Sequence, residues 1–93
     1  MKEIEILIPE DFAVEEASVF REKLNKLIDR GERHFILNFK NCTFVDSTGL
    51  GVLVGIYKRS KEVNGSLQFS SVVAPKVIKI FKLTRLDKVF GIE

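Results

Sequence analysis

Residues 44–57, Phe-Val-Asp-Ser-Thr-Gly-Leu-Gly-Val-Leu-Val-Gly-Ile-Tyr, constrain the fold more than any other part of the chain. An apolar segment with strand character, residues 42–45, ends at an aspartate that two hydroxyl residues follow. Asp46, Ser47 and Thr48 all carry side-chain oxygens that can accept the unpaired N–H groups of a first helical turn. The sequence therefore predicts a strand that ends where a helix begins. Ligands and partners of alternating α/β proteins bind at such junctions.

The rest of the chain repeats this alternation of strand and helix. Apolar runs and period-two patterns predict strands at 4–8, 35–39, 42–45, 67–73 and, last and shortest, 89–92. Apolar residues at steps of three and four predict helices over about 13–28 and 48–63, and a third helix that begins at Pro75. The fold class that follows is α/β, a small and mostly parallel sheet with helices packed on it.

Length and composition indicate one ordinary globular domain. The chain has 93 residues, 45% apolar and 30% charged, and a net charge of +2, which is too small to favour nucleic acid or an anionic membrane. Cys42 is the only cysteine, so no disulfide framework exists and a reducing cytoplasm is the expected location. The N-terminus lacks the apolar core of a signal peptide, and no run approaches the roughly 20 residues that span a bilayer.

The residues give little support to a role as an enzyme or as a cofactor-binding protein. Gly49, Gly51 and Gly55 follow a strand, but their spacing misses the Gly-x-Gly-x-x-Gly dinucleotide fingerprint by one residue. His34, the only histidine, lies in a charged turn, so Ser47 has no evident base. One cysteine and one histidine are too few for a metal site. We therefore expect no catalytic residue, no metal and no bound cofactor.

The helix over 48–63 is unusually apolar at its beginning. Apolar residues and glycines occupy positions 49–57, around most of the helix, and charge returns only at Lys58. Either the domain itself covers this surface or part of it awaits a partner. Glycine in a helix costs about 1 kcal/mol relative to alanine, so three glycines within seven residues call for a reason. Tight packing of helix on sheet is one reason, and close approach of another molecule is the other.

The hydroxyl groups at the junction also allow two interpretations. One of them can simply cap the helix, which is the commoner use of serine or threonine there. Alternatively, Ser47 can be a phosphorylation switch. A phosphate would be compatible with the helix N-terminus, because free N–H groups and the helix dipole favour anions. It would place close to two negative charges beside Asp46 and at the rim of an apolar surface, where desolvating that charge opposes binding.

Residues 44–53, Phe-Val-Asp-Ser-Thr-Gly-Leu-Gly-Val-Leu, resemble the signature of the STAS domain, in particular that of the bacterial anti-sigma factor antagonists. The resemblance extends along most of the chain and implies one STAS domain over 1–93. Glu10-Asp11 before an acidic helix resembles the family's turn before its first helix. Phe35-Ile36-Leu37-Asn38-Phe39 resembles its central strand. The C-terminal third is similar at three places: Asn64-Gly65, Pro75 and Phe81-Lys82-Leu83-Thr84.

The resemblance implies a function that the residues alone do not identify. In that family a kinase, which is also the anti-sigma factor, phosphorylates the first hydroxyl residue after the aspartate. That residue is Ser47 here, with Thr48 as the second choice. The unphosphorylated antagonist binds the kinase and frees the sigma factor, and a phosphatase reverses the modification. ATP belongs to the kinase, so this chain would not be an enzyme. The partner surface carried over from the family comprises Asp11, Asp46, Thr48, Gly49, Leu50, Gly51 and Leu53.

Two departures from the family pattern bear on this reading. Only residues 4–8 precede the Glu10-Asp11 turn, where the family usually has a longer N-terminal hairpin. Its first strand is therefore missing, or another molecule completes the sheet edge, and a weak homodimer joins the expected partners. Arg85 stands where the family usually has glycine. The alternative function is a STAS interaction module of a transporter or sensory complex that is never phosphorylated.

Overall fold

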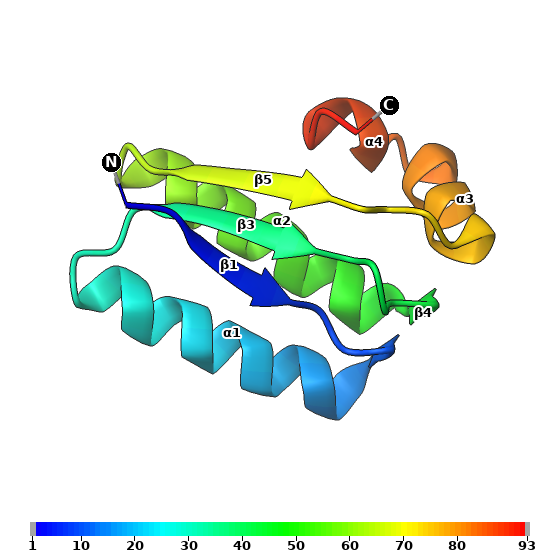
Figure 1. Cartoon of the computed structure of the whole chain (residues 1–93), viewed down its shortest axis with the longest axis horizontal. Helices are drawn as coiled ribbons and strands as arrows, with labels where there is room; N and C mark the ends of the chain where they lie inside the picture. The colour runs from blue at the N-terminus through cyan, green and yellow to red at the C-terminus, as the bar shows by residue number, and fades with distance from the viewer. Residues whose placement is uncertain (1, 93) are drawn as a thin grey trace.

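A three-stranded parallel sheet forms the centre of the computed structural model, which describes residues 2–92 (Figure 1). Its strands are β1 (Ile4–Leu7), β3 (His34–Asn38) and β5 (Ser66–Ser70), in the order β1-β3-β5. Ile6 pairs with Leu37, and Leu37 pairs with Phe69. All the strand pairs in residues 2–92 are parallel, so the predicted fold class is confirmed.

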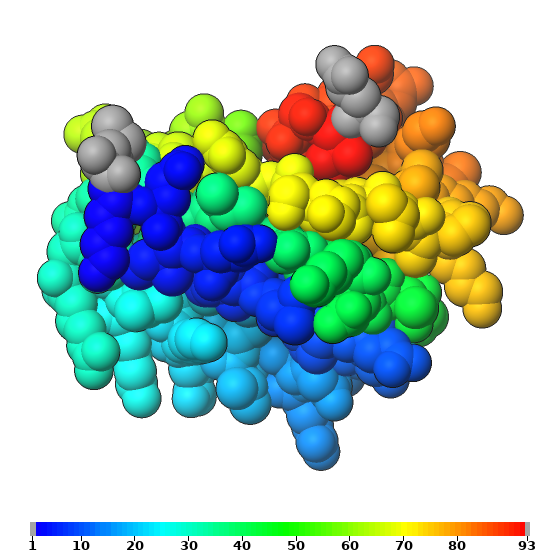
Figure 2. Space-filling model, in the orientation of Figure 1, coloured from blue at the N-terminus to red at the C-terminus, as the bar shows by residue number. Residues whose placement is uncertain are grey.

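Two long helices cover one face of this sheet. Helix α1 (Val14–Asp29) runs along the β1 side and α2 (Ser47–Glu62) lies behind the strands, whereas the opposite face carries no helix (Figure 1). Figure 2 shows β1, β3 and β5 at the surface of this open face. Alternate residues of the central strand, Phe35 and Leu37, point into the core and are almost fully buried. On the open face polar side chains pair across strands, since Asn38 donates to the Glu5 carboxylate at 2.8 Å.

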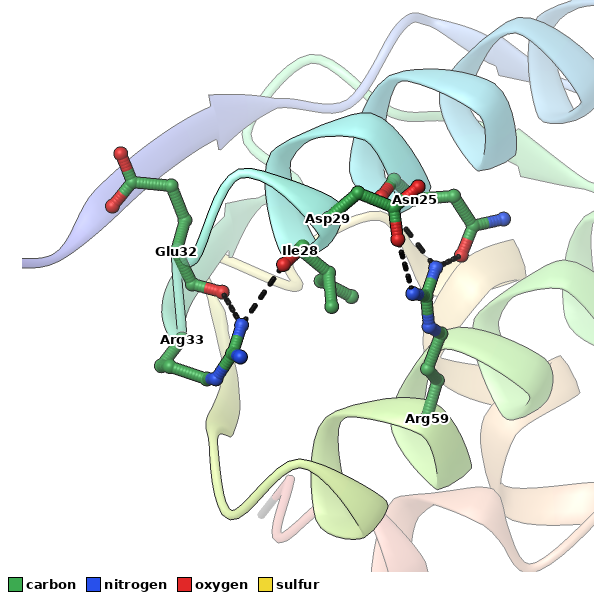
Figure 3. Close-up of polar contacts among 6 residues, drawn as sticks. All are labelled: Asn25, Ile28, Asp29, Glu32, Arg33 and Arg59. Atoms are coloured by element: carbon green, nitrogen blue, oxygen red, sulfur yellow. Dashed lines mark hydrogen bonds and ion pairs between the residues drawn. The ribbon is translucent and has the colours of Figure 1, made fainter.

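A polar cluster holds α1 against α2 at the end far from the strand–helix junction. The Arg59 guanidinium of α2 donates to the Asn25 side chain at 2.5 Å and to the Asp29 carboxylate at 2.6 Å (Figure 3). Arg33 donates to the Ile28 carbonyl at 2.9 Å, and this carbonyl, in the last turn of α1, also accepts the Gly31 N–H at 3.0 Å. These contacts fix the orientation of the two helices whose other ends form the junction.

The C-terminal segment differs from its prediction. Residues 89–92 were predicted to form a strand, but the chain forms α3 (Pro75–Leu83) followed by a short α4 (Leu86–Val89). Phe90 is buried and stacks on Phe69 with ring centroids 4.3 Å apart, so its apolar character serves the core and not a strand pair. In α3, Val77 and Phe81 are buried, whereas Leu83 is 70% exposed. No helix in residues 2–92 is both long and apolar enough to cross a membrane.

The backbone at Arg85 explains why glycine fits this position. Arg85 caps α4 in the left-handed conformation, with φ of +62°, where a side chain costs about 1–2 kcal/mol. We expect Arg85→Gly to raise the free energy of unfolding by about 0.5–1 kcal/mol, because the relief of this strain exceeds the added entropy of the unfolded chain. Urea denaturation measures this change in the free energy of unfolding. Thr84→Gly, at a position with φ of −89°, is the matched control and is expected to lose stability; equal loss in both variants would contradict the argument.

Candidate functional site

The junction between β4 (Phe44–Val45) and α2 leaves two hydroxyl groups free. Asp46 is the N-cap of α2, and its carboxylate accepts the Gly49 N–H at 2.8 Å. Of the three residues that could have capped this helix, the structure therefore selects Asp46. Ser47 and Thr48 are exposed, and neither hydroxyl has a hydrogen-bond partner among residues 2–92. Because both residues are exposed, their hydroxyl groups are accessible to a second protein.

Parallel pairing of β4 with β2 (Asp11–Phe12) brings a distant segment to this site. Asp11 pairs with Phe44, and Phe12 pairs with Val45. The Phe12 carbonyl also accepts the Asp46 N–H at 3.4 Å, so it holds the N-cap residue in place. Asp11 is the first residue of β2 and lies beside Phe44, whereas Asp46 follows the last residue of β4, so these two predicted site residues come from adjacent strands but from opposite ends of the short pairing. Asp11 is exposed and Asp46 is half-buried.

Gly49 is required by packing inside the domain. A Cβ atom there would collide with the Phe12 carbonyl oxygen and would lie 2.8 Å from Cδ2 of the same residue. By contrast, Cβ atoms at Gly51 and Gly55 would meet nothing within 4 Å. Gly49 is thus buried against β2, and its predicted place on the partner surface needs correction. Gly51 remains exposed on the helix.

Leu53 also has to be removed from the predicted partner surface. Its side chain is fully buried, with 0% of its area exposed, and belongs to the hydrophobic core. Leu50 is half-buried, one turn earlier, and packs partly against the core. The surface that the junction presents is accordingly smaller and more polar than predicted. It contains Asp11, Asp46, Ser47, Thr48, Leu50 and Gly51.

The apolar circumference of α2 is covered mostly by the domain itself. Val52 and Ile56 are buried, and Tyr57 packs on Phe90 with ring centroids 5.4 Å apart. Helix α1 lies on one side of α2, while β5 and the C-terminal segment lie on others (Figure 1). The excess of apolar residues is therefore no evidence for a partner, because α2 is the central helix of the domain.

An apolar hollow beside the junction was not predicted. It is about 410 Å³ in volume, and its walls are Thr43 and Phe44 on one side and residues 74–76 on the other. The Phe44 side chain is 46% exposed, and Lys76 adds a positive charge at the rim. The period of two could have shown Phe44 pointing outward, since Val45 points inward. Nothing local could have placed the start of α3 beside it, because residues 45–73 lie between the two segments.

Cys42 lies behind the site and is inert. It is buried, with 1% of its area exposed. This burial raises the pKa of the Cys42 thiol above its usual value, and the negative charge of Asp11 acts in the same direction. The thiol therefore stays protonated at neutral pH and is a poor nucleophile. The exposed hydroxyl groups at the start of α2 belong to Ser47 and Thr48, and these are the candidate sites of covalent modification.

Comparison with known proteins gives consistent matches over nearly the whole chain. Residues 6–93 match the STAS domain family. The chain is 36% identical over 90 residues to the anti-sigma-B factor antagonist of Bacillus subtilis strain 168, and the match covers 97% of this chain and 81% of that protein. It is 31% identical over 77 residues to the anti-sigma F factor antagonist of Paenibacillus polymyxa, with 82% of this chain and 65% of that protein covered.

Solved structures show the same fold. The NMR structure of the protein TM1081 of Thermotoga maritima has a TM-score of 0.82 and 24% identity, covering 94% of this chain and 70% of the other. The structure of the anti-sigma factor antagonist SpoIIAA in its unphosphorylated form has a TM-score of 0.72 and 22% identity, covering 96% of this chain and 90% of the other. At these identities the likeness establishes the fold alone.

Proposed function

The chain belongs to the STAS domain family, and we propose that it acts as an anti-sigma factor antagonist controlled by phosphorylation of Ser47. The relatives that are 31% and 36% identical are antagonists of anti-sigma factors, which favours the same role here. In this role the chain is a ligand and substrate of an anti-sigma factor kinase in the cytoplasm. The kinase binds and uses the ATP, and a separate phosphatase removes the phosphoryl group.

The observation that carries the proposal is that Asp46, and not Ser47, caps α2. Asp46 caps the helix, so the Ser47 hydroxyl is exposed and free of intramolecular hydrogen bonds in residues 2–92. A serine that capped the helix would have to give up its hydrogen bond before it could be phosphorylated. Ser47 can enter the active site of a kinase while the helix remains intact. Thr48 is equally exposed, and it is the alternative acceptor.

A phosphate on Ser47 would change the charge of the junction more than its structure. The N–H groups of Ser47 and Thr48 have no partner among residues 2–92, and together with the helix dipole they favour an anion. Asp46 already carries a negative charge directly before Ser47, and Asp11 begins the adjacent strand β2. Adding close to two negative charges there raises the desolvation cost of any interface that covers this junction. The modified form should therefore keep its fold and lose its partner.

The exposed surface around Ser47 defines the interface that we assign to the unmodified protein. It includes Asp11, Thr48, Leu50 and Gly51, and it extends across the hollow beside Phe44. Gly51 contributes no side chain, so the backbone of another protein can approach α2 closely there. Apolar groups of a kinase can fill the hollow while hydrogen-bond donors meet the two carboxylates. The exposed surface around Ser47 is small, and interfaces of small area are typical of reversible complexes.

Mass spectrometry of the protein purified from its own host, from growing and from stressed cells, tests the proposal. We expect a phosphoryl group on Ser47 whose occupancy differs between the two states, and fragment ions distinguish Ser47 from Thr48. The Ser47→Ala variant, expressed in the same host, is the control and should carry no phosphoryl group. If abundant wild-type protein stays unmodified in both states, the phosphorylation switch is wrong. A STAS module that binds a transporter or sensory complex without modification would then be the better reading.

A further inference from the structure

The free edge of β1 has backbone groups that no strand in residues 2–92 uses. β1 pairs only with β3, and Ile8 donates its N–H to the Asn38 carbonyl at 2.9 Å. Because residues of a strand alternate, Ile4 and Ile6 also direct their backbone groups toward β3. The N–H and C=O groups of Glu5 and Leu7 therefore point to the other edge. An edge of this kind can accept one more strand.

A groove lies along this edge, between β1 and the outer side of α1. It has a volume of about 400 Å³. Ile6, Leu7 and Pro9 form one wall, and the exposed side of α1 forms the other. Two of its apolar side chains face solvent, since Leu7 is 51% and Val19 is 67% exposed. Pro9 ends the edge, because it has no N–H to offer a neighbouring strand.

The charged residues on the α1 side of the groove indicate which kind of peptide segment the groove can bind. Glu15 and Glu16 lie in the first turn of α1, and neither forms an ion pair within residues 2–92. Helix α1 runs antiparallel to β1, so these carboxylates flank the end of the strand, and Lys23 lies two turns further along (Figure 1). A second copy would offer its own β1, which carries Glu5 and directly follows Glu3, to this acidic wall. Like charges disfavour that pairing.

We propose that this groove binds an extended segment of a partner protein, which adds a strand beside β1. The backbone of the segment hydrogen-bonds to the N–H and C=O groups of Glu5 and Leu7. Apolar side chains on one face of the segment pack against Val19 on the α1 side, an apolar side chain on its other face packs beside Leu7, and basic residues at one end meet Glu15 and Glu16. Main-chain bonds supply general affinity and the alternate side chains supply selectivity. The groove does not contain Ser47, so this binding is separate from the proposed switch.

Selection from a displayed library of random 12-residue peptides on the immobilised full chain tests the proposal. We expect enriched peptides that alternate apolar residues and carry lysine or arginine at one end. A synthetic enriched peptide should bind at least about tenfold more weakly to Leu7→Pro, which removes one outward N–H, than to Leu7→Thr, which keeps it. The double variant Glu15→Lys and Glu16→Lys should weaken binding by a similar factor. Protection of the Glu5 and Leu7 amides from hydrogen exchange should rise with bound peptide.

Val19→Arg keeps the test decisive if Leu7→Pro does not fold, because an exposed helix position tolerates arginine and the long cationic side chain obstructs the groove. It should bind the peptide at least about tenfold more weakly and should bind the kinase as the wild type does. Selection that yields no peptide, or peptides unaffected by Val19→Arg, would overturn the proposal. So would sedimentation showing a dimer of the wild-type protein that Val19→Arg dissociates, since the occupant would then be a second copy.

Discussion

Replacing Ser47 with aspartate is expected to weaken binding of the proposed partner, an anti-sigma factor kinase, about 100-fold or more. In the proposed interface a negative charge at position 47 has to be desolvated beside Asp46, and an unpaired buried charge costs about 3 kcal/mol or more. Each 1.4 kcal/mol corresponds to a factor of ten in the dissociation constant. The change reproduces part of the charge of a phosphoserine and needs no modifying enzyme. Titration calorimetry with the purified kinase measures the dissociation constants of the wild type and of Ser47→Asp.

The same variant separates an effect on binding from an effect on folding. An acidic residue in the first turn of a helix interacts favourably with the helix dipole, by about 0.3–1 kcal/mol, and the first turn of α2 has no acidic residue. Ser47→Asp should therefore unfold at equal or higher urea concentration than the wild type. Ser47→Ala is the matched control, which should bind the kinase normally and accept no phosphate at this position. Equal kinase affinity of Ser47→Asp and the wild type would refute the switch at Ser47.

Replacing Gly49 with alanine is expected to lower the free energy of unfolding by about 2–3 kcal/mol, a cost typical of overpacking. The new methyl group would collide with the Phe12 carbonyl and approach Val45 to 3.0 Å, so β2 or α2 has to move. A domain of this size has a total stability of about 5–14 kcal/mol, so the loss is a large part of it. Because Phe12 also holds Asp46, the junction should be disturbed as well.

Gly51 provides an internal control on the same helix. Alanine at this position meets no atom within 4 Å, so Gly51→Ala should gain about 0.5–1 kcal/mol from helix propensity. Urea denaturation of the two variants compares one substitution at two positions two residues apart. Opposite signs are the expected result. Equal changes in stability would show that the contact between Gly49 and Phe12 does not limit the packing of α2.

The amino-acid sequence was sufficient to predict the alternation of strands and helices and the place of the junction. Both follow from local rules, because hydrophobic periodicity reports which side of an element is buried and capping residues act within one turn. The helix over 48–63 is therefore found at Ser47–Glu62, and the strand over 35–39 at His34–Asn38. The same local rules could not choose among Asp46, Ser47 and Thr48 as the cap, since all three side chains can accept an N–H.

Only the tertiary structure decided which of these residues face a partner. The sequence left open whether the apolar start of α2 is covered, and the fold covers it, because α1, β5 and the C-terminal segment all pack against α2 (Figure 1). For the same reason Leu53 and Gly49 belong to the interior, while Phe44 shares an exposed hollow with the start of α3. Residue type and spacing describe the surface of one element. Whether that surface is buried depends on elements that the chain brings against it from tens of residues away.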